Sequence, residues 1–164
     1  MRQLMLMRHG EAESIFDAKS DHARCLTEFG KNQTTAQAHR FAPKPNDTLL
    51  VSDAMRTQQT AQILMDHCRS HSPDFAPTLT LSAKAYLSDF QSYMDLIGMT
   101  SDDTARLWVI GHNPGISELA FHLTHAYVGM GTSDIAEIQL DLNHWLDIGP
   151  SSGQLLGHHQ GRTH

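Results

Sequence analysis

The chain has 164 residues, enough for one domain whose core can fold without disulfides or a structural metal. Its formal net charge of −6 argues against a broad surface for nucleic acid or for an anionic membrane. The segment Met1–Met7 is too short and too weakly basic for a secretory signal, and no stretch approaches the roughly 20 apolar residues of a membrane span. Cys25 and Cys68 lie far apart and outside any C-x-x-C motif, which is typical of a reducing compartment and predicts a cytoplasmic protein.

Short apolar runs alternate with longer helical patterns, which is typical of a sheet with helices on both faces. Thr27 is of the residue type that caps helices, and Pro43 and Pro45 would stop the helix that follows it. The predicted elements of the first half are, in chain order, a strand over Gln3–Met7, a helix from Thr27 to about Ala42, a strand over Thr48–Val51, a helix over about Ala54–His67 and a loop over His71–Pro77.

The second half continues the same alternation, and neither a repeat nor a linker interrupts it. We therefore predict one domain over residues 1–150. The segment 151–164 is polar and rich in glycine, and we expect a flexible tail there. The predicted elements are strands over Thr78–Leu81 and Leu107–Ile110, helices over Ser88–Met99 and Pro114–Thr124, a half-buried strand over Ile135–Leu142, and His144–Ile148 as its hairpin partner.

Three polar clusters follow predicted strands at the point where each strand ends. They are Arg8–Glu11, Ser52–Arg56 and Gly111–Gly115. In open α/β sheets, ligands bind beyond the carboxyl ends of the strands, so we expect the three clusters to meet in one pocket.

The side chains of these clusters suit a phosphate group. The planar fork of an arginine such as Arg8 or Arg56 binds two phosphate oxygens at once. Helices that begin near Ala54 and Pro114 would add the positive ends of their dipoles. His9, followed by the flexible Gly10, could then attack phosphorus through a neutral ring nitrogen.

Each cluster has a simpler interpretation when it is taken alone. An Arg-His pair at a strand end is commonly a surface feature, and Gly111–Gly115 can be a turn that starts a helix. Arg56 can be a solvated helix residue. The functional interpretation depends on all three clusters lying after strands.

The segment Met7–Ala12 resembles the signature of the histidine phosphatase superfamily, which has the phosphoglycerate-mutase-like fold. The similarity runs in order from about residue 3 to about residue 148. Further stretches resemble the small SixA-type phosphohistidine phosphatase branch of that superfamily: Asp21–Gly30, Leu50–Thr60, Val109–Gly115 and Thr132–Ala136.

This resemblance implies a three-layer α/β/α sandwich with a mostly parallel sheet, and it assigns the catalytic residues. His9 would be the nucleophile that becomes phosphorylated. Arg8, Arg56 and a protonated His112 would bind the phosphoryl group, and Arg24 would be a further substrate contact. The resemblance implies neither a cofactor nor a metal.

The sequence departs from many phosphomonoesterases and mutases of the superfamily, which carry an acidic residue after the third strand. Here no carboxylate occurs between Leu81 and Asp89. An alkoxide leaving group needs a proton donor, whereas the imidazole released from phosphohistidine can be protonated before the bond breaks. The gap therefore favours a P–N substrate. The carboxylates that could replace the missing acid are those of Glu11, Glu13 and Asp17.

The leading hypothesis is therefore a phosphatase that removes phosphate from phosphohistidine on a protein such as a phosphotransfer domain, with inorganic phosphate as the product. The alternatives are a phosphomonoesterase for small phosphate esters and a phosphate-binding module without turnover. A chain of this length leaves little room for the insertions of a mutase, and we expect a monomer. Two histidine pairs, His67 with His71 and His122 with His125, lack the glutamate or cysteines of common zinc sites, so a metal site is not expected at either pair.

Overall fold

A computed structural model describes residues 1–74 and 77–161, and its centre is a six-stranded sheet with the order β3-β2-β4-β1-β5-β6. Strands β1 to β4 run parallel to one another. Strand β5 pairs antiparallel with β1, and β6 pairs antiparallel with β5. The strands are β1 (Arg2–Arg8), β2 (Thr48–Ser52), β3 (Thr78–Ser82), β4 (Arg106–Gly111), β5 (Ile135–Leu140) and β6 (Gly153–His159).

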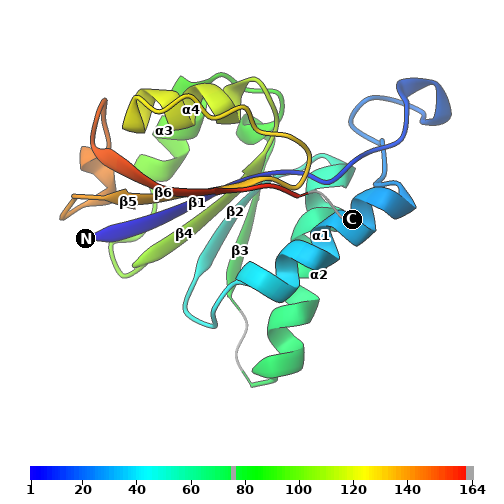
Figure 1. Cartoon of the computed structure of the whole chain (residues 1–164), viewed down its shortest axis with the longest axis horizontal. Coiled ribbons are helices and arrows are strands. Elements are labelled where there is room, and N and C mark those ends of the chain that lie inside the picture. The colour runs from blue at the N-terminus through cyan, green and yellow to red at the C-terminus, as the bar shows by residue number, and fades with distance from the viewer. Residues whose placement is uncertain (75–76, 162–164) are drawn as a thin grey trace.

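Four helices cover the two faces of this sheet (Figure 1). Helices α3 and α4 lie together on one face, and α1 and α2 lie together on the other. The predicted α/β/α sandwich with a mostly parallel sheet is confirmed. The helices are α1 (Glu28–Phe41), α2 (Met55–His71), α3 (Phe90–Gly98) and α4 (Gly115–Thr124).

Local capping explains where the helices begin. The hydroxyl of Thr27 accepts the amide N–H of Gly30 and starts α1 where the sequence predicts it. The carboxylate of Asp89 accepts the amide N–H of Ser92, so α3 begins at Phe90 rather than at Ser88. Helix α2 continues four residues past its predicted end, and residues 75 and 76 of the predicted loop lie outside the described residues.

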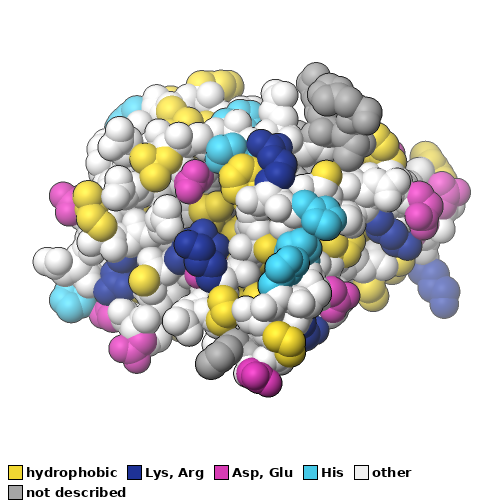
Figure 2. All heavy atoms as spheres, turned by 60° about the horizontal axis from the view of Figure 1, so that its bottom comes forward, with side chains coloured by type: hydrophobic (Ala, Val, Ile, Leu, Met, Phe, Trp, Pro, Cys, Tyr) yellow, Lys and Arg dark blue, Asp and Glu magenta, His cyan; other side chains and the backbone are white. Residues whose placement is uncertain are grey.

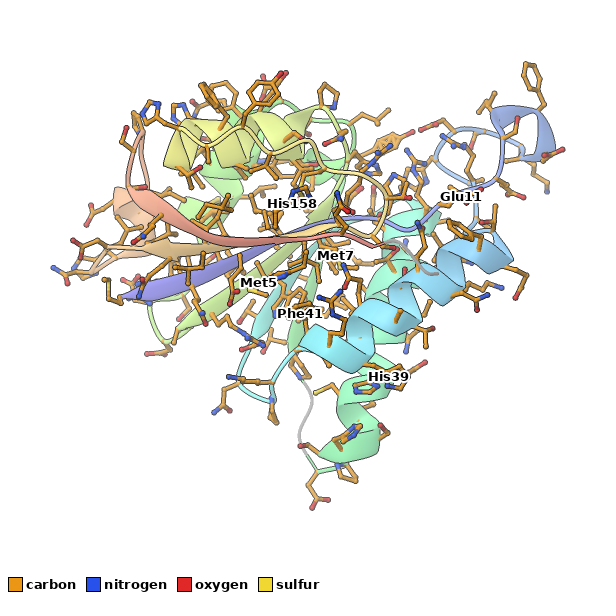
Figure 3. All side chains as sticks on the ribbon, in the orientation of Figure 1. Met5, Met7, Glu11, His39, Phe41 and His158 are labelled. Atoms are coloured by element: carbon orange, nitrogen blue, oxygen red, sulfur yellow. The ribbon has the colours of Figure 1, made fainter. Side chains whose placement is uncertain are left out.

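The core has two parts because successive residues of a strand point to opposite faces of the sheet. Leu4 and Leu6 of β1 pack under α3 and α4. Met5 and Met7 face the other way and pack, together with Phe41 of α1, between the sheet and the α1–α2 layer (Figure 3). Both sides of β1 are thus fully covered, which holds the end of the strand in place.

The C-terminal segment corrects the prediction of a flexible tail. Residues Gly153–His159 form β6 and pair antiparallel with β5, with a bulge beside Glu137 and Ile138. The carboxylate of Asp134 anchors the end of this segment by accepting the amide N–H of Gly161 at 2.8 Å. A polar, glycine-rich sequence is ordered here because β5 supplies it with a ladder of backbone hydrogen bonds.

The predicted hairpin partner of β5 is also wrong. Trp145–Asp147 form one turn of 3₁₀ helix, and Trp145 is completely buried. The Trp145 indole N–H donates to the carbonyl oxygen of Thr104, and its backbone N–H donates to the Asp102 carboxylate. These bonds tie the segment to the loop before β4 and leave β5 free to pair with β6.

The register of the parallel strands places three loops at one edge of the sheet. Arg8, the last residue of β1, lies beside Gly111 at the end of β4. Val51 of β2 lies beside Ile110 of β4, so β2 ends at the same level. The segments that follow these strands, which carry His9, His112 and Arg56, therefore start from neighbouring points.

The distribution of charged side chains on the surface agrees with the mixture of acidic and basic residues in the sequence. On the face shown in Figure 2, basic and acidic side chains are scattered among one another. Among the helices of residues 1–74 and 77–161, none is both long enough and apolar enough to cross a membrane.

Candidate active site

His9 follows directly after β1 and is 6% exposed. Its Nδ1 lies 2.6 Å from the carbonyl oxygen of Gly10, and since a carbonyl only accepts, Nδ1 carries the proton. The other ring nitrogen, Nε2, therefore keeps a free electron pair. The backbone hydrogen bond fixes the tautomer that a nucleophilic imidazole requires.

Arg56, in the first turn of α2, is 2% exposed and lies against His9. Its Nε–H donates to His9 Nε2 over 3.3 Å. Arg8 extends from the end of β1, and its Nη1 donates to the carbonyl oxygen of Met130 at 3.2 Å. Two guanidinium groups thus approach the same imidazole from different elements.

His112 follows β4, is 2% exposed and completes the cluster. The centroids of the His9 and His112 rings lie 5.3 Å apart. His112 Nε2 lies 2.7 Å from the hydroxyl of Ser52, and the phenol oxygen of Tyr93 accepts the His112 amide N–H. The structure therefore brings together Arg8, His9, Arg56 and His112, as the sequence predicts.

Burial keeps both imidazoles neutral. Removal from water lowers the pKa of His9 from 6.5 to about 3, and nearby positive groups act in the same direction. Burial also lowers the pKa of His112 from 6.5 to about 4, with Arg56 as the next cause. His112 is thus neutral before a ligand binds, while the expected protonated form concerns the ring with a phosphoryl group beside it.

Two buried nitrogens of this cluster have no hydrogen-bond partner within the described part of the chain. They are Nε of Arg8 and Nδ1 of His112. Buried polar groups are nearly always paired, and an unpaired one costs about 1–3 kcal/mol. Unpaired nitrogens beside an accessible imidazole electron pair suit an anionic ligand that would satisfy them.

Comparison with known proteins agrees with this geometry. The sequence profile of the histidine phosphatase superfamily (branch 1) matches residues 4–80. The matched residues, just under half of the chain, include Arg8, His9 and Arg56 and are similar to this superfamily. The expected enzyme class, a phosphatase, is confirmed at this level, while no curated protein sequence matches the chain.

Solved structures extend the similarity of this phosphatase over the whole chain. A protein from Nakamurella multipartitia assigned as a phosphohistidine phosphatase SixA has a TM-score of 0.82 at 21% identity, with 97% of this chain and 95% of that chain covered. A protein histidine phosphatase SixA complexed with tungstate has a TM-score of 0.77 at 23% identity and 97% coverage of both chains. A mycobacterial glucosyl-3-phosphoglycerate phosphatase has a TM-score of 0.69 at 13% identity and 99% coverage of both. These matches establish the fold.

Close backbone packing, rather than flexibility, explains Gly10 in this phosphatase. A Cβ on Gly10 would lie 2.7 Å from the carbonyl oxygen of Gly30, and a Cβ on Gly30 would lie 2.0 Å from that of Glu11. The two glycines let α1 approach the loop after β1, where Glu11 lies (Figure 3). This contact fixes the backbone that carries His9.

Asp21 is a residue of the site that the sequence analysis missed. Its Oδ2 accepts from Nη2 of Arg56 at 3.1 Å and from the phenol O–H of Tyr86, while its Oδ1 accepts from Nη1 of Arg24 at 3.0 Å. These bonds, led by that of Tyr86, lower the pKa of Asp21. Arg24 is thus brought to the site, although through Asp21 and not through direct contact with His9.

The three carboxylates considered as proton donors occupy other positions. Glu13 accepts the amide N–H of Cys25, and Asp17 is exposed in a 3₁₀ turn over Ile15–Asp17. Glu11 is half-buried, and its backbone binds α1 and its cap through Gln33 and Thr27. Among the described residues, the carboxylate bonded to Arg56 is that of Asp21.

The loop over 130–134 supports the site from the far side. The Met130 carbonyl oxygen accepts from Arg8 and from the side-chain amide of Asn113. Asp134 holds this loop by accepting the Gly131 amide N–H, and it also pairs with His158 of β6. The Thr132–Ala136 motif contains this anchor, but its contacts with β6 leave no signal in the sequence.

Proposed function

We propose that this phosphatase removes the phosphoryl group from phosphohistidine on another protein, through a phosphorylated His9. The observation that carries the proposal is the hydrogen bond from His9 Nδ1 to the Gly10 carbonyl oxygen. It keeps Nε2 unprotonated, and without a substrate this nitrogen accepts the Nε–H of Arg56. A buried imidazole held in this tautomer is suited to attack on phosphorus.

In the first step, the electron pair of Nε2 forms a bond to phosphorus while the bond to the leaving group breaks. Charge on the phosphoryl oxygens would be met by Arg8, Arg56 and His112. When Ser52 donates its O–H to Nε2 of His112, the proton of the neutral ring resides on the unpaired Nδ1. His112 then donates to the phosphoryl group without carrying a positive charge.

In the second step, water attacks the phosphorus on His9, and the P–N bond breaks. The electron pair returns to Nε2, and inorganic phosphate leaves with the oxygen of the water. The scheme uses the side chains of this chain alone. The two free cysteines, Cys25 and Cys68, fit the cytoplasmic location that we propose.

Hydrolysis of small phosphate esters is the second candidate. It is favoured by the similarity in fold to the glucosyl-3-phosphoglycerate phosphatase. Against it, Ala83–Ala85 form a 3₁₀ turn after β3 and Tyr86 follows, so no carboxylate occupies the place of an ester-protonating acid there. A binding module without turnover would not need a nucleophile in the tautomer of His9.

The test is turnover of a phosphorylated histidine-phosphotransfer domain, compared with a panel of phosphate esters. We expect the wild type to prefer the phosphoprotein, to form an acid-labile phosphoenzyme on rapid quenching, and to release inorganic phosphate. His9→Ala should lower kcat by roughly 10⁴-fold or more. Turnover that survives in His9→Ala, or a phosphoenzyme labelled at another residue, contradicts the mechanism. Faster turnover of esters than of the phosphoprotein selects the second candidate.

A further inference from the structure

Asp21 has one acceptor position left after its contacts are counted. A carboxylate offers about four lone-pair positions on its two oxygens. Arg56 and Tyr86 occupy the two positions on Oδ2, and Arg24 occupies one on Oδ1. The side chain is 36% exposed, so part of the carboxylate group is open to solvent and to a ligand.

Arg56 connects this carboxylate to the nucleophile. Its Nε lies 3.3 Å from His9 Nε2, and its Nη2 lies 3.1 Å from Asp21 Oδ2. A phosphoryl group attacked in line by His9 has its leaving group on the side away from the buried His9, toward the exposed end of the site. Asp21 is the carboxylate that Arg56 holds at that end.

We propose that Asp21 binds the leaving group, by accepting through Oδ1 the N–H on the unphosphorylated ring nitrogen of the substrate histidine. The inference rests on the proposed phosphohistidine hydrolysis and names the chemical feature that the site recognises. That feature is a leaving group with an N–H donor and a positive charge.

The way in which the P–N bond breaks explains why this contact would favour the reaction. A ring that carries phosphorus on one nitrogen and a proton on the other is positively charged. When the P–N bond breaks, its electron pair returns to the ring, which leaves as neutral imidazole with the proton still on the second nitrogen. Without that proton the ring would leave as an anion, a far poorer leaving group. Asp21 would therefore hold the substrate in its reactive protonation state.

The charges around Asp21 are compatible with this role. Arg56 faces it from α2, Arg24 from its own loop and Tyr86 from the segment after β3, and the charge of His112 after β4 also depends on it. The phosphoryl dianion would offset the two guanidiniums when substrate binds. These donors keep Asp21 ionised, so its charge is present throughout the pH range in which the substrate ring titrates.

A pH profile on two substrates tests the proposal. The substrates are a phosphohistidine peptide and p-nitrophenyl phosphate, whose leaving phenolate has no N–H and needs no proton. With the wild type, the alkaline decline in kcat for the peptide reports loss of the ring proton in the enzyme–substrate complex. Asp21→Asn should move this decline about one to two pH units lower. At pH 8.5 it should lower kcat/KM for the peptide about tenfold more than for the ester.

Asp66→Asn is the control, because Asp66 is an aspartate that pairs with an arginine, Arg69, on the exposed part of α2 and not with Arg56. It should leave the peptide-to-ester ratio and the pH profile unchanged. Asp21→Glu keeps the charge and should restore part of the alkaline activity, which separates loss of the contact from loss of the fold. Equal losses on both substrates with an unmoved decline would overturn the proposal. Failure of the wild type to cleave the peptide would instead contradict the proposed function.

Discussion

The site has two regions, a buried floor and a partly exposed rim, and they differ in whether their polar groups have partners within the chain. The floor, formed by Arg8, His9, Ser52 and His112, is largely buried and contains two nitrogens that have no hydrogen-bond partner among residues 1–74 and 77–161. The rim, formed by Asp21, His22, Arg24 and Tyr86, is partly exposed, and its charges are paired within the chain. The comparison suggests that the floor is built for an incoming phosphoryl group and the rim for the group that departs. Arg56 contacts both.

After loss of the nucleophile itself, the largest expected effect is that of Arg56→Ala. Loss of this guanidinium removes the contact with His9 and the anchor of Asp21, and kcat/KM should fall roughly 10³-fold or more on any substrate. Arg24→Ala removes a rim contact alone and should cost less than about tenfold. Steady-state kinetics on p-nitrophenyl phosphate measures the loss of kcat/KM in both variants. Similar losses in the two would contradict the distinction between floor and rim.

The stability of the folded chain should depend on pH through the floor. In the unfolded chain, His9 and His112 take up protons as the pH falls through about 6.5, whereas in the folded chain they stay neutral down to about 3 and about 4. The unfolded state then binds more protons, so stability falls as the pH drops from 7 toward 4. Each ring should cost on the order of 2 kcal/mol by pH 5.

Urea unfolding at pH 7 and pH 5 measures this loss. His9→Asn and His112→Asn should each remove part of it, whereas a variant at an exposed histidine, His144→Asn, should leave it intact. An unchanged pH dependence in both floor variants would show that the two rings are not held neutral.

A smaller effect is expected for Ser52→Ala. Its hydroxyl lies 2.7 Å from His112 Nε2, and its loss frees the ring to place its proton on either nitrogen. The value of kcat should fall roughly 10- to 100-fold, with KM changed less. Ser70→Ala, an exposed serine near the end of α2, is the control. A change in KM alone would argue that Ser52 does not orient His112 in the reaction.

The smallest effect is expected for Tyr86→Phe, which removes one donor to Asp21 and leaves Arg56 and Arg24 in place. On the ester, kcat/KM should fall by about fivefold, since one neutral donor is worth about 1 kcal/mol. A loss of kcat/KM as large as that of Arg56→Ala would show that Tyr86 acts with the residues of the floor and not with those of the rim.

The sequence predicted the floor because each of its main residues follows a buried parallel strand. Arg8, His9, Arg56 and His112 could be placed from strand periodicity alone, with errors of one or two residues at strand ends. The rim could not be predicted in this way. Asp21 meets Arg56 and Tyr86 through side-chain contacts between loops 35 and 65 residues apart, and no local pattern encodes them.

The fold shows the same division. Apolar runs identify β1, β2 and β4, which are buried on both faces. Strand β6 contains two glycines and two histidines, and its order comes from the partner strand rather than from its own composition. His144–Ile148 has the apolar residues of a strand, yet Trp145 is captured by the loop before β4.

Strand β6 affects how the chain folds while it is being synthesised. It covers the open edge of β5 and braces, through His158 and Asp134, the loop that holds Arg8. Until the ribosome has released residues 153–159, β5 exposes unpaired backbone groups of the kind that recruit strands from other molecules. A nascent chain stalled before this point would therefore lack the support of the loop that holds Arg8, and it would also expose the unpaired, aggregation-prone edge of β5. Pairing of β6 would correct both defects.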